Sequence, residues 1–438
     1  MSKCINPRCE YLIHTDFKNN GGKHCCKLCK NTGDGHGPLC QKLGVFRPYL
    51  KFHSELDASA LEASDASDAS DSSEANSSSS ETSNLRVKRS WFKANELASI
   101  YKFPKPEGHK VIGVISLGGG LFGNVDTNGV LTDGDVQHYW GNVCKINPVN
   151  FPKVIVIPID GAKNKPKMND GSATIENTMD VETIGACCPS SDTTIIIYIG
   201  KNNASSFSNL ILHATTTPKV INGISYKPTI LSISWGMAEV LTTSTALTAT
   251  NLAMRNATMA GITICTATGD SGSSDIPNID FPSSSPYSCA CGGTSLVCPT
   301  LKYDGAGTVE TVWAGSGGGI SLKFSKPSWQ HSVTATGRSI PDIASNADPD
   351  TGVIFYVGGK NGKIHQYGGT SIAAPTLAAY FACSNVNTFI TPKLYLAPNA
   401  SFNDITTGSN GFYNASTGYD NCTGKGSIVG NILNSHLN

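Results

Sequence analysis

The chain has 438 residues, of which 39% are hydrophobic and 15% are charged, so it can bury a large core. Its 33 basic and 33 acidic residues give a net charge of +0, which offers no electrostatic reason to expect nucleic acid or an anionic membrane as a partner. The N-terminus lacks the apolar run of a secretory signal, and no segment has the roughly 18 apolar residues that span a bilayer. We therefore expect a soluble, unexported globular protein, and its compartment stays open.

Residues 1–45 are rich in cysteine and histidine. A Cys-x-x-Cys pair followed by His-x-x-x-Cys has spacing typical of tetrahedral zinc sites. So short a segment cannot bury enough apolar surface to fold without a metal or disulfides. We expect a small zinc module that docks a protein partner, with a disulfide knot or free thiols as the alternative. The candidate ligands are Cys4, Cys9, His24, Cys25, Cys26, Cys29, His36 and Cys40.

Residues 54–84 are predicted to form a disordered acidic linker. This segment consists almost wholly of Ser, Ala, Asp, Glu and Asn, and it lacks the apolar periodicity that drives collapse. A domain boundary is therefore expected near residue 85. Residues 86–438 are expected to form one large domain.

The large domain is predicted to be α/β. Short continuous apolar runs are typical of strands buried on both faces, and helical patterns cover 174–187 and 243–259. An order of strand, helix, strand favours a parallel sheet flanked by helices. The expected strands are 111–117, 154–159, 194–200, 230–235 and 262–267.

Two carboxylates stand four residues apart in the helix predicted over 174–187. Glu176 and Asp180 would project from one face of this helix. Such a pair is usually solvated, but a buried pair would share a proton, and one pKa would rise. Glu176 could then accept a proton from a serine in mildly acidic solution.

The segment ATGDSGSSD, residues 267–275, follows the strand predicted over 262–267 and carries Asp270 in a glycine-rich turn. Its GDSG letters also occur around the nucleophile of chymotrypsin-like proteases, which would make Ser271 the nucleophile. Those proteases are antiparallel barrels whose motif continues Gly-Gly-Pro, and neither feature is present here. A turn with a solvent-facing Asp270 is the alternative.

Ser371 lies between a Gly-Gly turn and a helix that we expect to start at once, with Pro375 in its first turn. The free N–H groups of a helix N-terminus favour the negative charge of a serine nucleophile and its oxyanion. A simple N-cap is the alternative. A histidine base is not expected, because the His-Gly-Thr setting of subtilisins is absent around His109, His138 and His213.

Seven motifs occur in an order that resembles the sedolisin, or serine-carboxyl peptidase, family, and they cover roughly residues 92–432. The resemblance implies a subtilisin-like α/β fold in which a glutamate replaces histidine as the base. The motifs are ENTMD, SISWG, ATGDSG, FPSSSPYSCACGGT, PDIASNADPDTG, GGTSIAAP and GYDNCTG.

The same resemblance implies a role for each matching residue. Ser371 would be the nucleophile, Glu176 its general base and later acid, and Asp180 the carboxylate that orients Glu176. Asp270 would be a protonated carboxyl that donates to the oxyanion, which requires acid. We therefore expect an acid-acting endopeptidase that cleaves polypeptides through an acyl-enzyme, in an acidic compartment or outside the cell.

The family also binds calcium, and the matching stretch here is FNDITTG with ASTGYDNCTG. An all-oxygen set suits Ca²⁺. Ser416 stands where the family usually has glycine, which matters little for a carbonyl ligand unless the backbone there is left-handed. The implied ligands are the side chains of Asp404 and Asp420 and the carbonyls of Ile405, Ser416 and Gly418.

Two alternatives to this enzyme remain open. The first is a catalytically silent protein that binds peptides in a groove of the same fold, and the second is a histidine-dependent subtilisin-like enzyme. The family normally has a large folded prodomain, and only about 85 residues precede the catalytic region here. We expect that prodomain to be missing, with the cysteine module or a separate chain in its place, and we expect a monomer.

Overall fold

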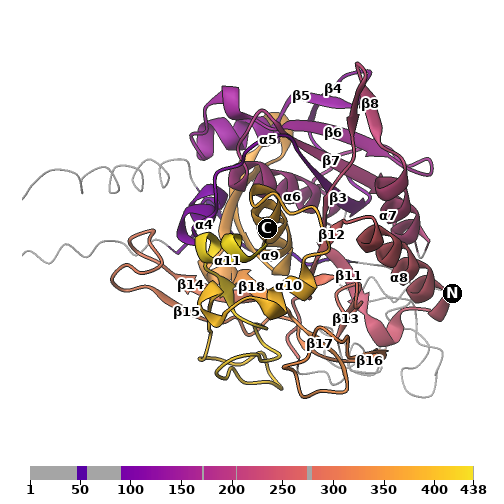
Figure 1. Ribbon diagram of the computed structural model, residues 1–438. Coiled ribbons are helices and arrows are strands. Elements are labelled where there is room, and N and C mark those ends of the chain that lie inside the picture. The colour runs from indigo at the N-terminus through magenta and orange to yellow at the C-terminus, as the bar shows by residue number, and fades with distance from the viewer. Residues whose placement is uncertain (1–46, 57–89, 170–171, 204, 274–278, 438) are drawn as a thin grey trace, which may run out of the picture.

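A twelve-stranded sheet organises the part of the chain that this computed structural model describes, residues 47–56, 90–169, 172–203, 205–273 and 279–437 (Figure 1). Eight consecutive strands, from β22 to β6, pair in parallel, and antiparallel strands extend the sheet. In spatial order the strands are β21 (Phe402–Asn403), β22 (Ser427–Ile428), β18 (Ile343–Asn346), β14 (Cys289–Val297), β12 (Thr263–Ala267), β10 (Ile230–Ile233), β3 (Lys110–Leu117), β7 (Thr193–Gly200), β6 (Lys153–Pro158), β5 (Val130–Gly134) and β4 (Gly123–Val125), with β15 (Val309–Val312) beside β14.

Helices cover both faces of this sheet. Alternate residues of β3 enter two separate apolar cores: Ile112 and Val114 face one, and Val111 and Ile115 face the other. Figure 1 shows one group of helices to either side of the strands. The first core contains α4 (Ala94–Ile100), α6 (Ala173–Cys187) and α9 (Thr370–Cys383), and the second contains α7 (Ser206–Thr216) and α8 (Ser244–Met259).

This architecture confirms the predicted α/β class with a mainly parallel sheet flanked by helices. Both predicted helices form within one residue of their expected bounds. Four of the five predicted strands do the same, and the fifth ends early, at Ile233. The chain leaves the main sheet there, because β11 (Trp235–Ala238) pairs in a different sheet, with β1 (Arg47–Pro48) and β13 (Asp280–Phe281).

The predicted linker over 54–84 is wrong at its start. Residues 54–56 belong to β2 (Lys51–Leu56), which pairs with β20 (Lys363–Gly368) in a small sheet that also holds β19 (Val353–Val357). Backbone hydrogen bonds hold β2, whose side chains are mostly exposed, so apolar periodicity gave no sign of it. The large domain therefore includes residues 47–56 as well. The remainder of the predicted linker, residues 57–84, and the whole predicted zinc module, residues 1–45, lie outside the described residues.

Smaller elements complete the described chain. Two hairpins pair β8 (Lys219–Ile221) with β9 (Ile224–Tyr226) and β16 (Gly319–Ser325) with β17 (Gly337–Ile340). Short helices are α5 (Asp135–His138), α10 (Thr391–Leu396) and α11 (Gly430–Leu437). Where the structure describes the chain, it has no helix both long enough and apolar enough to cross a bilayer.

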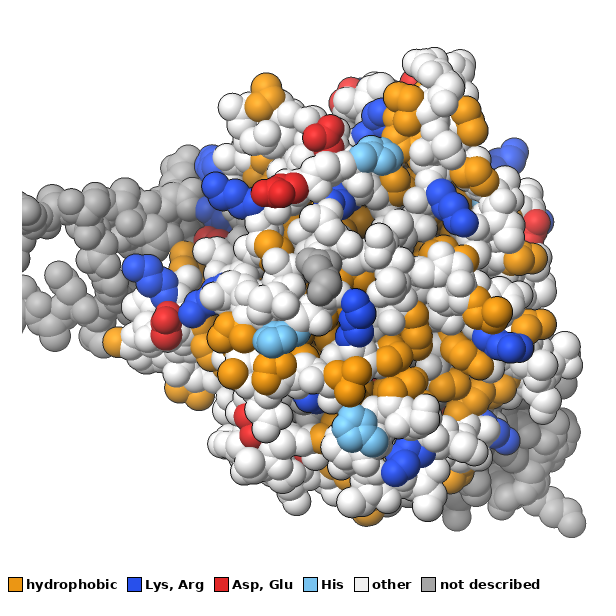
Figure 2. Space-filling view, viewed as in Figure 1, with side chains coloured by type: hydrophobic (Ala, Val, Ile, Leu, Met, Phe, Trp, Pro, Cys, Tyr) orange, Lys and Arg blue, Asp and Glu red, His pale blue; other side chains and the backbone are white. Residues whose placement is uncertain are grey.

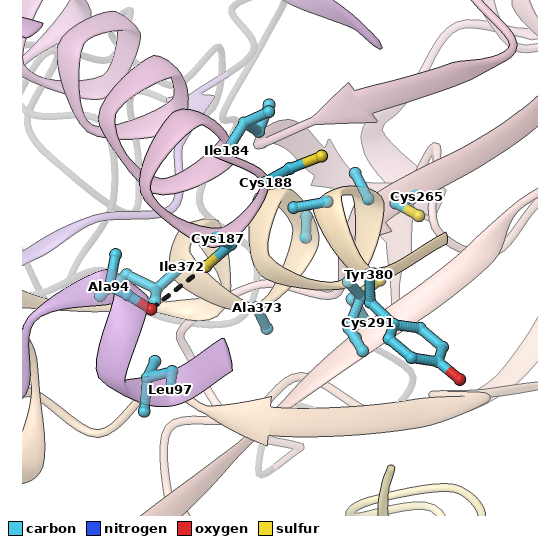
Figure 3. Close-up of a cluster of buried hydrophobic side chains, with 14 of the residues drawn as sticks. Ala94, Leu97, Ile184, Cys187, Cys188, Cys265, Cys291, Ile372, Ala373 and Tyr380 are labelled. Carbon is cyan, nitrogen blue, oxygen red and sulfur yellow. Dashed lines mark hydrogen bonds between the residues drawn. The ribbon is translucent and has the colours of Figure 1, made fainter. Parts of the chain in front are cut away.

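Helices α6 and α9 pack side by side over the sheet, with α4 against them (Figure 3). Cys187 on α6 donates a hydrogen bond to the Ala94 carbonyl on α4, at 3.2 Å. The cysteines of this region are buried free thiols, and Cys265, Cys289 and Cys291 lie within 4.8 Å of one another under α9. Small, well-packed side chains thus fix two helices that carry candidate site residues.

Charged side chains of both signs are scattered over the face shown in Figure 2. Hydrophobic side chains gather in the lower half of that face, over the region where Figure 1 places α8 and α10. The ends of these two helices expose Met259 and Leu396, respectively, with about three quarters of each side chain accessible, at 74% and 76%.

Candidate active site

The candidate residues meet where neighbouring parallel strands end. Ser234 follows β10 and Asp270 follows β12, so both lie at the carboxyl edge of the sheet. Helices α6 and α9 place Glu176, Asp180 and Ser371 at the same edge. In open α/β sheets, ligands commonly bind in the crevice outside these strand ends.

Glu176 and Asp180 are both completely buried on α6. The Ser234 hydroxyl donates a hydrogen bond to Asp180 Oδ1 at 2.7 Å. Among the described residues, neither of the two Glu176 carboxyl oxygens has a well-formed hydrogen bond. Asp180 Oδ2 has none either. The solvated pair, which was the ordinary alternative for this spacing, is therefore excluded.

Burial raises the pKa of both carboxyls well above the ordinary range. For Glu176 the charge of Asp180 raises the pKa further, and the nearby Ser371 hydroxyl partly opposes that rise. For Asp180 the Ser234 hydroxyl is the opposing influence. Two carboxyls so placed cannot both ionise freely, so they hold a proton between them in mild acid.

Ser371 is the second residue of α9, and Gly369 is the N-cap, with a φ of 124° that glycine readily adopts. The N-cap interpretation of Ser371 is therefore wrong. Pro375 lies beyond the first turn, which also corrects our expectation. Because Pro375 has no N–H, the Ser371 carbonyl lacks its usual helical donor. The Ser234 hydroxyl oxygen lies 3.4 Å from this carbonyl, but its single proton is directed to Asp180 Oδ1 at 2.7 Å.

Asp270 is 93% buried, so it is not the solvent-facing turn residue of the alternative interpretation. Its Oδ1 atom accepts hydrogen bonds from the Thr370 backbone N–H at 2.8 Å and the Thr370 hydroxyl at 2.9 Å. Burial raises the pKa of Asp270 to about 6, although the bonds from Thr370 and the charge of Lys51 oppose the rise. In the described structure Oδ2 is buried without a hydrogen-bond partner, as a protonated donor awaiting an acceptor would be.

The alternative nucleophile and base lie elsewhere. Ser271 is exposed, next to the buried Asp270. His138 stacks on Tyr356 with ring centroids 3.9 Å apart, and His213 lies on α7, on the opposite face of the sheet from α9. His109 packs against Tyr226. In the described residues, therefore, none of these three histidines is available to Ser371.

The predicted calcium ligands lie around one loop. Asp404 Oδ2 accepts from the Gly418 backbone N–H at 2.9 Å, and Asp420 Oδ2 accepts from the Ser416 N–H at 3.0 Å. Both carboxylates thus meet the same turn. Burial raises the pKa of Asp420, and hydrogen bonds from Ser416, Thr423 and Cys422 oppose this rise. The oxygen donors around residues 404–405 and 416–420 fit a hard cation such as Ca²⁺.

Sequence reasoning missed three residues of this site. Ser234 bonds Asp180, Thr370 bonds Asp270, and the Tyr49 carbonyl accepts from the Ser371 backbone N–H at 3.1 Å. Ser234 lies in the SISWG motif and Thr370 lies in GGTSIAAP, but the motifs alone predicted no role for either residue. Tyr49 lies in none of the motifs. Its contact with Ser371 is made by its backbone carbonyl, which leaves no side-chain signal in the sequence.

The fold and these residues define a subtilisin-like α/β protein with buried carboxyls, instead of a histidine, beside the candidate serine. No family model matches the chain. Kumamolisin of Bacillus sp. (strain MN-32) is 34% identical over 368 residues, which cover 76% of this chain and 61% of kumamolisin. Sedolisin of Pseudomonas sp. (strain 101) is 29% identical over 307 residues, which cover 61% of this chain and 50% of sedolisin.

A solved structure supports the same fold. Pseudomonas sedolisin, described as a serine-carboxyl proteinase complexed with two molecules of pseudo-iodotyrostatin, superposes with a TM-score of 0.65. It shares 24% sequence identity, and the match covers 79% of this chain and 97% of that chain. The chain belongs to the sedolisin family, and it spans between half and two thirds of the length of these curated relatives.

Proposed function

We propose that the chain is an acid-acting serine-type endopeptidase that hydrolyses polypeptides through an acyl-enzyme on Ser371. The observation that carries this proposal is the fully buried Glu176–Asp180 pair, with raised pKa values, beside a serine at a helix N-terminus. The relationship to kumamolisin and sedolisin supports the same activity.

The first chemical step would use the pair as a base. Ser371 Oγ attacks the carbonyl carbon of the substrate, and its proton passes to Glu176. Asp180, held by Ser234, orients Glu176 and shares the proton that the pair carries. Glu176 then returns a proton to the leaving amine, and a water molecule hydrolyses the ester by the reverse sequence.

Oxyanion stabilisation would come from the Ser371 backbone N–H and from Asp270. A carboxyl can donate a hydrogen bond only while it is protonated, and the pKa of Asp270, raised to about 6, keeps it neutral in acid. Above that pH the carboxylate would repel the oxyanion. Acid activity is thus a consequence of the donor that occupies this site.

Calcium would have a structural role. Asp404 and Asp420, with the carbonyls of Ile405, Ser416 and Gly418, would hold Ca²⁺ and link two parts of the C-terminal loop. None of these residues is among the four proposed for the chemistry, so the ion would stabilise the fold without entering the reaction.

A catalytically silent peptide-binding protein is the second candidate, and the complete set of acid, base and donor groups argues against it. The test incubates the full chain with a peptide library from about pH 3 to 8 and identifies fragments by mass. We expect cleavage in acid by the parent and by Ser232→Ala, a control at a second buried serine, and no cleavage by Ser371→Ala. Peptide binding without cleavage by the parent would favour the silent protein.

A further inference from the structure

Three cysteines that take no part in the proposed chemistry meet on the face of the sheet covered by α9. Cys265 lies on β12, and Cys289 and Cys291 lie on β14. The parallel pairing of these strands sets Cys265 opposite Cys289 and Ala267 opposite Cys291. Because side chains alternate along a strand, all four residues face the same apolar core. Three of these four neighbouring positions therefore carry a thiol, and the fourth carries only a methyl group.

The spacing of the three sulfur atoms suits a metal ion. They lie within 4.8 Å of one another. An ion at their centre would lie at most about 2.8 Å from each sulfur, and a zinc–thiolate bond is roughly 2.3 Å long, so a shift of about half an ångström per sulfur gives bonding distance. In the part of the chain that the structure describes, no histidine or carboxylate joins them as a fourth ligand. We call Cys265, Cys289 and Cys291 the core thiol cluster.

The core thiol cluster is sealed from water, which limits the charge that it can hold. All three cysteines are 0% exposed. Burial is the main cause that raises the pKa of each thiol well above its ordinary value, so the thiols are neutral when no metal is bound. A bound cation displaces thiol protons, and any net charge that remains in an apolar core is costly. A neutral complex has as many thiolates as the ion has positive charges.

The number of ligands and the demand for neutrality favour a monovalent soft ion. Thiolate ligands select Cu(I), zinc or iron–sulfur clusters. Structural zinc almost always has four ligands, and iron–sulfur clusters are commonly held by four cysteines, whereas this cluster supplies three. Asp342 lies near enough for its charge to act on Cys289 and Cys291, but it already pairs with buried Arg338 at 2.6 Å. Cu(I) needs to displace only one thiol proton to give a neutral complex.

We propose that Cys265, Cys289 and Cys291 bind one Cu(I) ion, through one thiolate and two thiols. The ion joins β12 to β14 on the face where α9 packs, and Figure 3 shows Cys265 and Cys291 beside this helix. Asp270 follows β12 and Ser371 lies on α9, so the ion stabilises the scaffold of the candidate active site without entering the reaction. Because the thiols are fully buried, the ion enters as the chain folds.

The test measures copper in the full chain, produced in copper-supplemented medium and purified without oxygen. The protein is equilibrated with Cu(I) buffered by the chelator bathocuproine disulfonate, and elemental analysis gives the copper bound per chain. Thiols in residues 1–45 can also bind copper, so the measurement compares variants that share this segment. We expect the parent to hold one copper more than Cys265→Ala/Cys289→Ala/Cys291→Ala. Cys298→Ala, at a buried free thiol just beyond β14, is the matched control and should hold as much as the parent.

Further measurements keep the proposal testable if the triple variant does not fold. Cys291→Ala removes one ligand and should weaken binding of the additional copper by more than the roughly 10- to 100-fold that loss of an outer-shell partner costs. The difference between the copper X-ray absorption spectra of the parent and Cys291→Ala should show three sulfur neighbours. Cu(I) should raise the melting temperature of the parent and of Cys298→Ala, because it binds the native state.

Each outcome bears on the core thiol cluster alone. Equal copper in the parent and in the variants that lack cluster thiols overturns the site. Uptake of zinc instead of copper by the cluster, when both ions are offered, overturns the monovalent assignment. A parent melting temperature that Cu(I) does not change overturns a native-state site. None of these measurements uses peptide cleavage, so failure of this proposal leaves the proposed endopeptidase standing.

Discussion

The Asp270 carboxyl is tied to Thr370, the residue before Ser371, by hydrogen bonds of 2.8 Å from its backbone nitrogen and 2.9 Å from its hydroxyl. Both bonds end on Oδ1, so they fix the direction of Oδ2. The loop after β12 and the start of α9 are thereby locked together. These two hydrogen bonds between Thr370 and Asp270 therefore fix the proposed oxyanion donor and the nucleophile relative to each other.

Replacement of Asp270 by asparagine should weaken the pH dependence of catalysis. An amide donates at any pH, whereas Asp270 donates only below its pKa of about 6. We expect Asp270→Asn to be slower at the acid optimum, by less than the roughly 10²- to 10³-fold that complete loss of an oxyanion donor costs. Its alkaline limb should extend to higher pH. The measurement is kcat/KM from about pH 3 to 8, and coincident alkaline limbs in both proteins would contradict the role of Asp270.

The same carboxyl should make the folded state less stable as pH rises. Between the ordinary pKa of 3.8 and the folded value of about 6, the native state binds more protons than the unfolded state, so unfolding free energy falls with pH. This shift corresponds to about 3 kcal/mol. We would measure denaturant unfolding of Ser371→Ala across this range, with Ser371→Ala/Asp270→Asn as the control. The free energy of unfolding of the double variant should fall less with rising pH than that of Ser371→Ala. An equal fall in the two proteins would show that Asp270 is not responsible.

Ser234 should act as a positioning residue for the Glu176–Asp180 pair. Ser234→Ala removes the 2.7 Å hydrogen bond to Asp180, and bonds to charged groups contribute about 1.5–3 kcal/mol, so kcat should fall roughly 10- to 100-fold. The Ser234 hydroxyl lowers the pKa of both carboxyls, so its loss should move the acid limb to higher pH. Ser232→Ala, at a buried serine of the preceding strand β10, is the control. An unshifted acid limb in Ser234→Ala would limit Ser234 to a structural role.

Calcium removal should lower the melting temperature of the protein. An ion that binds only the native state stabilises it by mass action. Asp420→Ala should abolish the effect of a chelator, because it removes one carboxylate from the loop. Asp304→Ala, at an exposed carboxylate paired with Lys102, should leave the effect intact. A melting temperature that the chelator does not change, together with no calcium in elemental analysis, would contradict the proposed calcium site.

The order of strands and helices could be predicted because buried parallel strands appear as continuous apolar runs, such as 194–200 in β7. The proposed chemical groups could be predicted because the resemblance was carried by the motifs that contain them. Strands β1 and β2 could not, since backbone atoms make their pairing contacts. In addition, β1 has only two residues, and the side chains of β2 are largely exposed. The burial of Asp270 also depends on Thr370, which is distant in sequence and close only in the fold.

The N-terminal segment offers a separate prediction. If residues 1–45 form a zinc module, elemental analysis should find zinc in the full chain, and chelation should leave peptide cleavage unchanged, because the proposed chemical groups all lie beyond residue 170. A chain that begins at residue 47 keeps β1 and β2 and should fold and cleave. A folded but inactive truncated chain would show that the module takes part in catalysis.

Covalent catalysis by Ser371 should leave an acyl-enzyme that can be trapped. The measurement is the intact mass of the protein after reaction with a peptide ester substrate and rapid acid quenching. We expect the parent chain to gain the mass of the acyl group, and peptide mapping to place this group on Ser371. Ser371→Ala should gain no mass and should not turn over the ester. Turnover by Ser371→Ala at the rate of the parent, or an acyl group on another residue, would contradict covalent catalysis by Ser371.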